Sequence, residues 1–162
     1  MKAILFLILL FFLAGTVHSQ SNKYKYALSA EIGKSGLIYS LIFDNTLKDR
    51  KFGLRGGMGT NFGRYRSAIM GLVGAYRLFG KNGHFFETGI DLHYLSIENI
   101  SDDQAGISTF VHPNYPTRTY YITANGGYRV HAGKILFRVG IAPGFTKDEF
   151  IPGGYLSFGF RF

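Results

Sequence analysis

The sequence has no cysteine and no tryptophan, and only 4 of its 162 residues are proline. Without cysteine the chain forms no disulfide and binds no metal through thiolate, and it lacks the residue at which a lipoprotein is anchored. Apolar runs are also short: the longest, Ala3–Leu13, falls well below the roughly 20 residues of a transmembrane helix. Disulfide scaffolds, lipoproteins and helical membrane proteins are therefore disfavoured.

Positive charge is in excess but is not concentrated anywhere. Lys and Arg number 18 against 10 Asp and Glu, which gives a net charge of +8. These cations form no run and no helix face, so the electrostatic footprint of a nucleic-acid-binding protein is missing. We expect no nucleic-acid partner.

The first residues have the pattern of a secretory leader. Lys2 precedes the apolar stretch Ala3–Leu13, and the small residues Val17 and Ser19 follow before Gln20. This order predicts a signal peptide over 1–19, with a single mature domain over 20–162. An uncleaved anchor is the alternative, and the short apolar stretch argues against it.

Aromatic residues and glycine are abundant in the mature chain, with 16 Phe, 11 Tyr and 22 Gly. They fall in segments that alternate between large apolar and small or charged residues, the mark of strands with two different faces. The last segment shows the pattern best, since Leu156, Phe158, Phe160 and Phe162 alternate with smaller or cationic residues. We predict eight strands: Lys23–Ile32, Leu37–Asp44, Lys51–Phe62, Ala68–Phe79, Phe85–Ile97, Arg118–Val130, Ile135–Ala142 and Gly153–Phe162.

Eight antiparallel strands suit a barrel either in a membrane or in water. The apolar faces carry almost no charge, whereas a soluble barrel needs a charged exterior. On the fourth strand we place Met70, Leu72, Tyr76 and Leu78 on the lipid side, opposite Arg77. The pattern favours an all-β, eight-stranded, antiparallel up-and-down transmembrane barrel.

Strand arginines then have to face the lumen, because an arginine facing lipid costs about 2–4 kcal/mol at the bilayer midplane. Carboxylates project from the same polar faces and can pair with them. For Arg161 the candidate acids are Glu87 and Asp44. The predicted inner charge cluster is Glu31, Asp44, Arg55, Arg77, Glu87, Asp91, Arg129, Arg138 and Arg161.

This pattern resembles the small outer-membrane β-barrel family of the OmpA/OmpX type without a periplasmic domain. The features that carry the resemblance are the leader, the eight alternating strands and the terminal aromatic Phe162. The resemblance implies a Gram-negative outer-membrane location among phospholipid and lipopolysaccharide, and Phe162 as the signal read by the outer-membrane assembly machinery. It also implies a lumen filled by side chains.

Loop lengths predict the orientation. With both termini in the periplasm, the turns at 45–50, 80–84 and 131–134 lie on the periplasmic side. The longer connections at 98–117 and 143–152 then lie at the cell surface, as expected for this class of barrel. We expect a monomer that can meet an extracellular ligand through these two loops.

Three functions remain open. The first is a structural or interaction role with no catalytic activity and no cofactor; the second is a narrow pore through the charge cluster. The third is a lipid A-modifying enzyme, for which the loop residues Asp102, Asp103, Ser108 and His112 supply residue types but no positioned motif. No two histidines have metal-ligand spacing, so we expect no metal site. We favour the first function.

Overall fold

The computed structural model describes residues 24–33, 39–47, 51–60, 66–99, 118–147 and 150–162. The expected leader at 1–19 lies outside them. No helix among the described residues is long and apolar enough to cross a membrane. The strands are β1 (Tyr26–Gly33), β2 (Tyr39–Thr46), β3 (Phe52–Thr60), β4 (Arg66–Lys81), β5 (His84–Asn99), β6 (Arg118–Ala132), β7 (Ile135–Ile141), β8 (Gly144–Phe145), β9 (Phe150–Ile151) and β10 (Gly154–Arg161).

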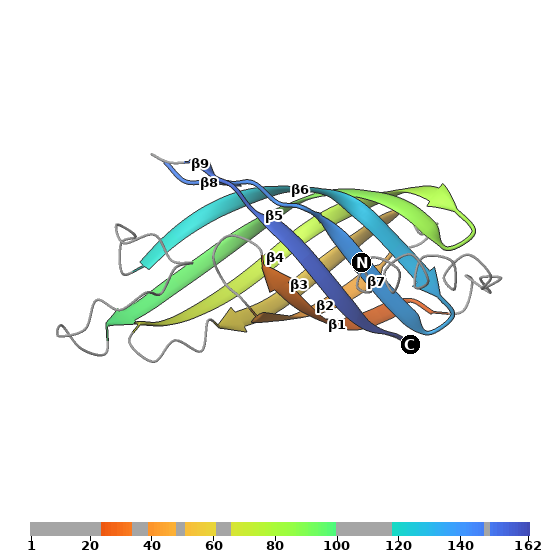
Figure 1. Ribbon diagram of the computed structural model, residues 1–162, viewed down its shortest axis with the longest axis horizontal. Helices are drawn as coiled ribbons and strands as arrows, with labels where there is room; N and C mark the ends of the chain where they lie inside the picture. The colour runs from red at the N-terminus through yellow and green to blue at the C-terminus, as the bar shows by residue number, and fades with distance from the viewer. Residues whose placement is uncertain (1–23, 34–38, 48–50, 61–65, 100–117, 148–149) are drawn as a thin grey trace, which may run out of the picture.

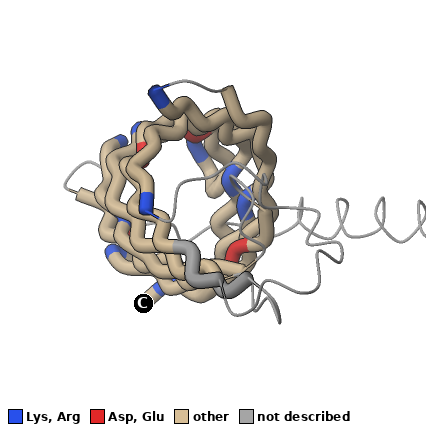
Figure 2. Tube along the Cα trace, turned by 90° about the vertical axis from the view of Figure 1, so that its left-hand side faces the viewer, with Lys and Arg blue, Asp and Glu red and all other residues tan. Residues whose placement is uncertain are grey.

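Eight of these strands close into a barrel, which confirms the predicted fold class. Neighbours in sequence pair antiparallel from β1 to β7, and β10 pairs with both β7 and β1. The last pairing joins the two ends of the sheet, so the barrel has no free edge. Figure 1 shows the tilted strands from the side, and Figure 2 shows the closed ring from one end.

Two of the hairpins turn over only two residues. Lys81 pairs directly with His84, and the intervening Asn82 and Gly83 have φ values of 57° and 84°. Positive φ at both positions is the requirement of a type I′ turn, which Asn-Gly satisfies best. This turn fixes the register of β4 against β5 along their whole length.

The connection predicted at 143–152 contains a short hairpin of its own. In this hairpin Phe145 of β8 pairs with Phe150 of β9, and their rings meet edge to face at 5.5 Å. Phe145 also pairs with Ile122 of β6, so the hairpin is an extension of the barrel wall. The sequence analysis gave 143–152 only as a connection, and the structure adds that Gly144–Phe145 continues the ladder on β6 beyond β7.

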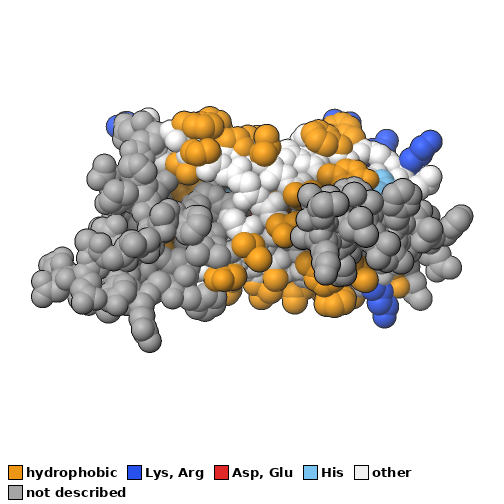
Figure 3. Space-filling model, viewed as in Figure 1, with side chains coloured by type: hydrophobic (Ala, Val, Ile, Leu, Met, Phe, Trp, Pro, Cys, Tyr) orange, Lys and Arg blue, Asp and Glu red, His pale blue; other side chains and the backbone are white. Residues whose placement is uncertain are grey.

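Strand faces follow the predicted alternation on seven strands, with large apolar side chains outside and small or charged ones inside. On β10, for example, Leu156, Phe158 and Phe160 are exposed while Ser157 and Arg161 are buried. Figure 3 shows patches of hydrophobic side chains along much of the described surface on one face of the barrel.

The fourth strand is the exception, and its faces are opposite to the prediction. Met70, Leu72, Tyr76 and Leu78 are buried in the lumen. Both faces of β4 are apolar, so its own alternation does not choose between them. The Asn82–Gly83 turn decides, because it places Leu78 directly opposite the inward Glu87.

Part of the lumen is consequently an apolar core. Met70 and Leu72 of β4 pack there with residues from three other strands and the start of β4 itself. Its members are Ile42, Ala68, Met70, Leu72, Leu95 and Tyr121, each no more than 4% exposed. These side chains pack against one another toward the end of the barrel away from the two tight turns.

Candidate functional site: a buried charge network in the lumen

Between the apolar core and the end of the barrel with the two tight turns, the lumen holds four carboxylates and four guanidiniums. Each is 5% exposed or less, and they come from seven different strands. Burial of a charged group in a low-dielectric interior is costly unless an opposite charge and hydrogen bonds compensate. The members are Glu31, Asp44, Arg55, Glu87, Asp91, Arg129, Arg138 and Arg161.

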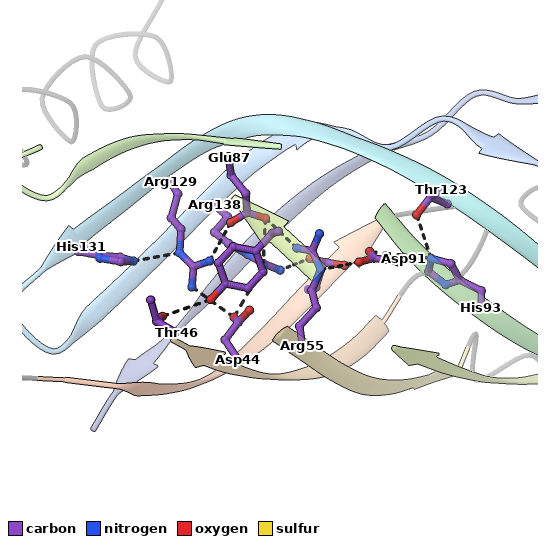
Figure 4. Close-up of polar contacts among 12 residues, drawn as sticks. Asp44, Thr46, Arg55, Glu87, Asp91, His93, Thr123, Arg129, His131 and Arg138 are labelled. Carbon is purple, nitrogen blue, oxygen red and sulfur yellow. Dashed lines mark hydrogen bonds and ion pairs between the residues drawn. The ribbon is translucent and has the colours of Figure 1, made fainter. Parts of the chain in front are cut away.

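Glu87 of β5 is the central acid of this network. Its Oε1 accepts a hydrogen bond from Arg55 Nη1 at 2.7 Å, and its Oε2 accepts one from Arg129 Nη1 at 2.7 Å. Arg55 also donates through Nε to Asp91 Oδ1 at 2.6 Å. Figure 4 shows these groups converging along the barrel axis. Both oxygens of Glu87 thus accept a hydrogen bond from a guanidinium, and these charge-assisted bonds offset the free-energy cost of removing the carboxylate from water.

Arg138 of β7 joins the network from the other side of the lumen. Its Nη2 donates to Glu31 Oε2, a residue 107 positions earlier in the chain. Its Nη1 lies 3.6 Å from both Asp44 Oδ2 and Glu87 Oε1, and Asp44 Oδ2 lies 3.4 Å from Arg129 Nη2. Arg138 therefore ties together acids from β1, β2 and β5.

Two tyrosine rings support the guanidiniums. The Tyr76 ring lies 5.4 Å from the guanidinium carbon of Arg55 and 4.8 Å from that of Arg129. The Tyr155 ring lies 5.6 Å from that of Arg138. These distances are within the range of cation–π attraction, which is strongest in a desolvated site.

Glycines make room for these groups on the inner face. A methyl group at Gly74 would collide with the Asp91 carboxylate, and one at Gly53 with the Tyr76 ring. Gly74 pairs directly with both Arg55 and Asp91, so it lies where their side chains meet. Absence of a side chain at these two positions is a packing requirement of the network.

Histidines flank the network at both ends. At the turn end, His131 Nε2 accepts a hydrogen bond from Arg129 Nε at 2.9 Å. At the other end, the His93 ring stacks on Tyr121 at 4.5 Å, and its two nitrogens lie 3.0 Å from Thr123 Oγ1 and from Met70 Sδ. Neither histidine was among the predicted site residues, because the sequence alone does not show which side chains of other strands they contact. Among the described residues no group of three His, Asp or Glu is arranged to hold a metal ion.

The sequence-based placement of Arg77 inside the lumen was wrong. Arg77 is exposed on the outer face of β4, with its guanidinium carbon 5.0 Å from the Phe52 ring and 4.9 Å from the Phe79 ring. The physical reason is the β4 register described above. In its place the inner face presents Tyr76, a network residue that the sequence analysis assigned to lipid. The Asn82–Gly83 dipeptide was the signal that could have found it.

Arg161 lies inside as expected, but near the turn end. Its Nη1 donates to the main-chain oxygen of Gly133 at 3.2 Å, and its Nη2 to that of Tyr24 at 3.3 Å. Of its two candidate acids, Glu87 is hydrogen-bonded to Arg55 and Arg129, and Asp44 lies nearest Arg129 and Arg138. Arg161 holds the β6–β7 turn and the start of the chain's first strand together.

Phe162, the predicted assembly signal, completes the ladder between the first and last strands. Its main-chain N–H donates to Tyr26 O at 2.9 Å, and its carbonyl accepts from Tyr26 N at 3.0 Å. Its ring is exposed on the outer face, 6.1 Å from the Tyr26 ring. The loop residues considered for catalysis, Asp102, Asp103, Ser108 and His112, lie outside the described residues.

No family model and no curated protein matches this chain. Solved structures do. The chain is similar to the N-terminal β-barrel domain of Pseudomonas aeruginosa OprF, with a TM-score of 0.64, 16% identity, and coverage of 85% of this chain and 96% of that one. It is similar at lower scores to the Yersinia pestis outer membrane protein Ail (TM-score 0.48, 11% identity, coverage 86% and 100%) and to Neisserial surface protein A (TM-score 0.45, 12% identity, coverage 84% and 92%). The chain thus has the fold of the eight-stranded outer-membrane barrels.

Proposed function

We propose that this chain is an integral outer-membrane barrel whose lumen is closed and whose role is structural or interactive. One observation carries the proposal: large apolar side chains are exposed on the outside of the barrel as an apolar belt, while ion pairs and a small apolar core lie buried inside. A protein in water has no use for such a belt, because exposed apolar patches of this extent mark a contact with lipid or protein. In a membrane the arrangement is the stable one.

Membrane fractionation and gel mobility test this location. Expressed in a Gram-negative host, the protein should sediment with the outer membrane. Without boiling it should migrate faster on a denaturing gel than after boiling, because the closed barrel resists detergent. Recovery in the soluble periplasm would contradict the proposal.

The proposed orientation places both termini and the turns at 80–84 and 131–134 in the periplasm. Since the natural chain has no cysteine, single-cysteine variants give an unambiguous readout. Lys147→Cys, near the β8–β9 hairpin, should react with a membrane-impermeant maleimide on intact cells. Lys81→Cys, in the β4–β5 turn, should react only after the outer membrane is opened. The reverse labelling pattern would invert the orientation.

A narrow pore is the alternative that the lumen residues address. The contacts of Arg129 and Arg138 with Asp44 cross the lumen, because Asp44 lies on β2, across the eight-stranded ring from β6 and β7. An eight-stranded barrel has an interior only wide enough for side chains, so we expect no open channel. Planar-bilayer recordings of the purified protein should show no stable conductance. A steady conductance that disappears in Arg138→Ala would favour the pore.

We propose further that the chain has no catalytic activity and meets its partners through the connections at 98–117 and 143–152. The exposed, edge-to-face pair of Phe145 and Phe150 supports this, because it presents aromatic surface at the loop end of the barrel. A lipid-modifying activity is tested by mass analysis of lipid A from a strain with the gene deleted. An altered acyl-chain composition would replace the interaction role by an enzymatic one.

A further inference from the structure

Arg77 is a strand cation that the lumen network does not use. It is exposed on the outer face of β4, directly opposite Phe52 on β3 and Thr88 on β5. Toward the loop end of the same face, β4 continues with apolar side chains such as Val73, which is 61% exposed. Arg77 thus lies in the half of the apolar belt nearer the two tight turns, with exposed Phe79 and Phe86 between it and the β4–β5 turn.

Two aromatic rings are the neighbours of the Arg77 guanidinium. The rings of Phe52 and Phe79 lie 5.0 and 4.9 Å from the guanidinium carbon. A ring over a guanidinium occupies its flat face, and the N–H groups point outward in the plane. Within the described part of the chain no carboxylate pairs with Arg77, and both cross-strand partners are uncharged. The donors therefore face the surroundings of the barrel.

Arg77 lies near enough to the turn end of the barrel for a long side chain to reach toward the headgroup region of a bilayer. It lies five residues from the turn at Asn82. A strand tilted at about 40° and rising about 3.3 Å per residue advances roughly 2.5 Å per residue along the barrel axis, so Arg77 lies about 12 Å from the turn. A long side chain there can extend its charge toward the interface while its stem stays against apolar surface.

We propose that Arg77, cradled by Phe52 and Phe79, binds the phosphate of a membrane phospholipid in the leaflet at the turn end. The guanidinium matches phosphate oxygens with two parallel N–H donors, and the adjacent apolar face of β3 and β4 accommodates the acyl chains. This inference rests on the proposed membrane location. It assigns a lipid site outside the lumen, where the sequence pattern suggested none.

Native mass spectrometry of the purified barrel in micelles tests the site with phosphatidylglycerol as the added lipid. Wild type should retain one phosphatidylglycerol, and Arg77→Gln should lower the bound fraction about fivefold or more by removing two charge-assisted hydrogen bonds. The bound fraction for Arg77→Lys should lie between those two values, because lysine keeps the positive charge but lacks the paired, planar N–H donors of the guanidinium. Diacylglycerol, which has the acyl chains but no phosphate, should bind all variants equally weakly.

Lys81→Gln is the matched control, since it removes an exposed cation from the end of the same strand. It should leave phosphatidylglycerol retention unchanged. Phe79→Leu provides a second variant that keeps Arg77 and removes one ring, and it should lower retention less than Arg77→Gln. Each variant is first checked for the heat-shifted band of a folded barrel. Equal retention by wild type and folded Arg77→Gln overturns the lipid site alone, whereas a wild-type protein absent from membranes overturns the proposed function.

Discussion

At the scale of single residues, the lumen depends on charges that cannot be removed one at a time. Arg138 is fully buried and contacts Glu31, Asp44 and Glu87. Removing it would leave three buried carboxylates short of positive charge. Loss of one partner from a buried ion pair costs far more than the pair contributes in net stability.

We therefore expect Arg138→Met, which keeps most of the volume, to lower the free energy of unfolding by about 3–5 kcal/mol. Urea-induced unfolding in micelles measures this. Arg118→Met removes an exposed cation at the loop end of β6 and should change stability by less than about 0.5 kcal/mol. Combining Arg138→Met with Glu31→Gln should cost less than the sum of the two single changes. Strict additivity would show that this pair is not coupled.

At the scale of strands, β4 shows how a hairpin turn decides which face is buried. Its two-residue turn at Asn82–Gly83 sets Gly74 opposite Asp91. Directly paired residues lie on the same face of a sheet, so Gly74 faces inward like Asp91, and alternation then determines the face of every other residue of β4. Gly74 lies inside against the Asp91 carboxylate, and Gly71 lies outside with open space around it. The same residue type thus has two different roles three positions apart.

This difference gives a prediction within one strand. Gly74→Ala should displace the Asp91 carboxylate from Arg55 and lower the free energy of unfolding by about 1–3 kcal/mol, as expected for overpacking. Gly71→Ala, whose methyl group would meet no atom within 4 Å, should be neutral or slightly stabilising. Unfolding in micelles compares the two. A larger loss at Gly71 would contradict the assigned faces of β4.

At the scale of the whole molecule, closure of the barrel joins the first and last strands of the described chain. Phe162 forms two main-chain hydrogen bonds with Tyr26, so the final residue completes the β1–β10 seam. Its ring points outward and is 59% exposed. An outward ring adds little to packing inside the barrel, so the role proposed for it, recognition during assembly, can be tested apart from stability.

Phe162→Ala should therefore reduce the amount of assembled protein in cells by severalfold while changing refolding into micelles little, because the main-chain bonds remain. Immunoblots of heat-modifiable protein in the outer membrane, compared with in vitro refolding yields, separate the two effects. Phe160→Ala, on the same outer face of β10, is the control and should assemble better than Phe162→Ala. An equal loss in cells and in micelles would make Phe162 a stability residue and remove its role as a signal.

The local pattern of the sequence determined the eight strands of the barrel and, on seven of them, which face points outward. Alternation suffices wherever one face is apolar and the other is small or charged, as on β10. It also placed Glu31, Asp44, Glu87 and Asp91 in the lumen, because a charged carboxylate that faces lipid destabilises the barrel.

Only the tertiary structure decided the rest. The face of β4 was undetermined because both of its faces are apolar, and the hairpin register had to resolve it. The pairing of Arg138 with Glu31, 107 positions apart, exists only once β7 and β1 take their places in the ring, with β10 between them. Which arginine lies in the lumen and which one lies on the outer face follows from the register of the paired strands, since directly paired residues share a face.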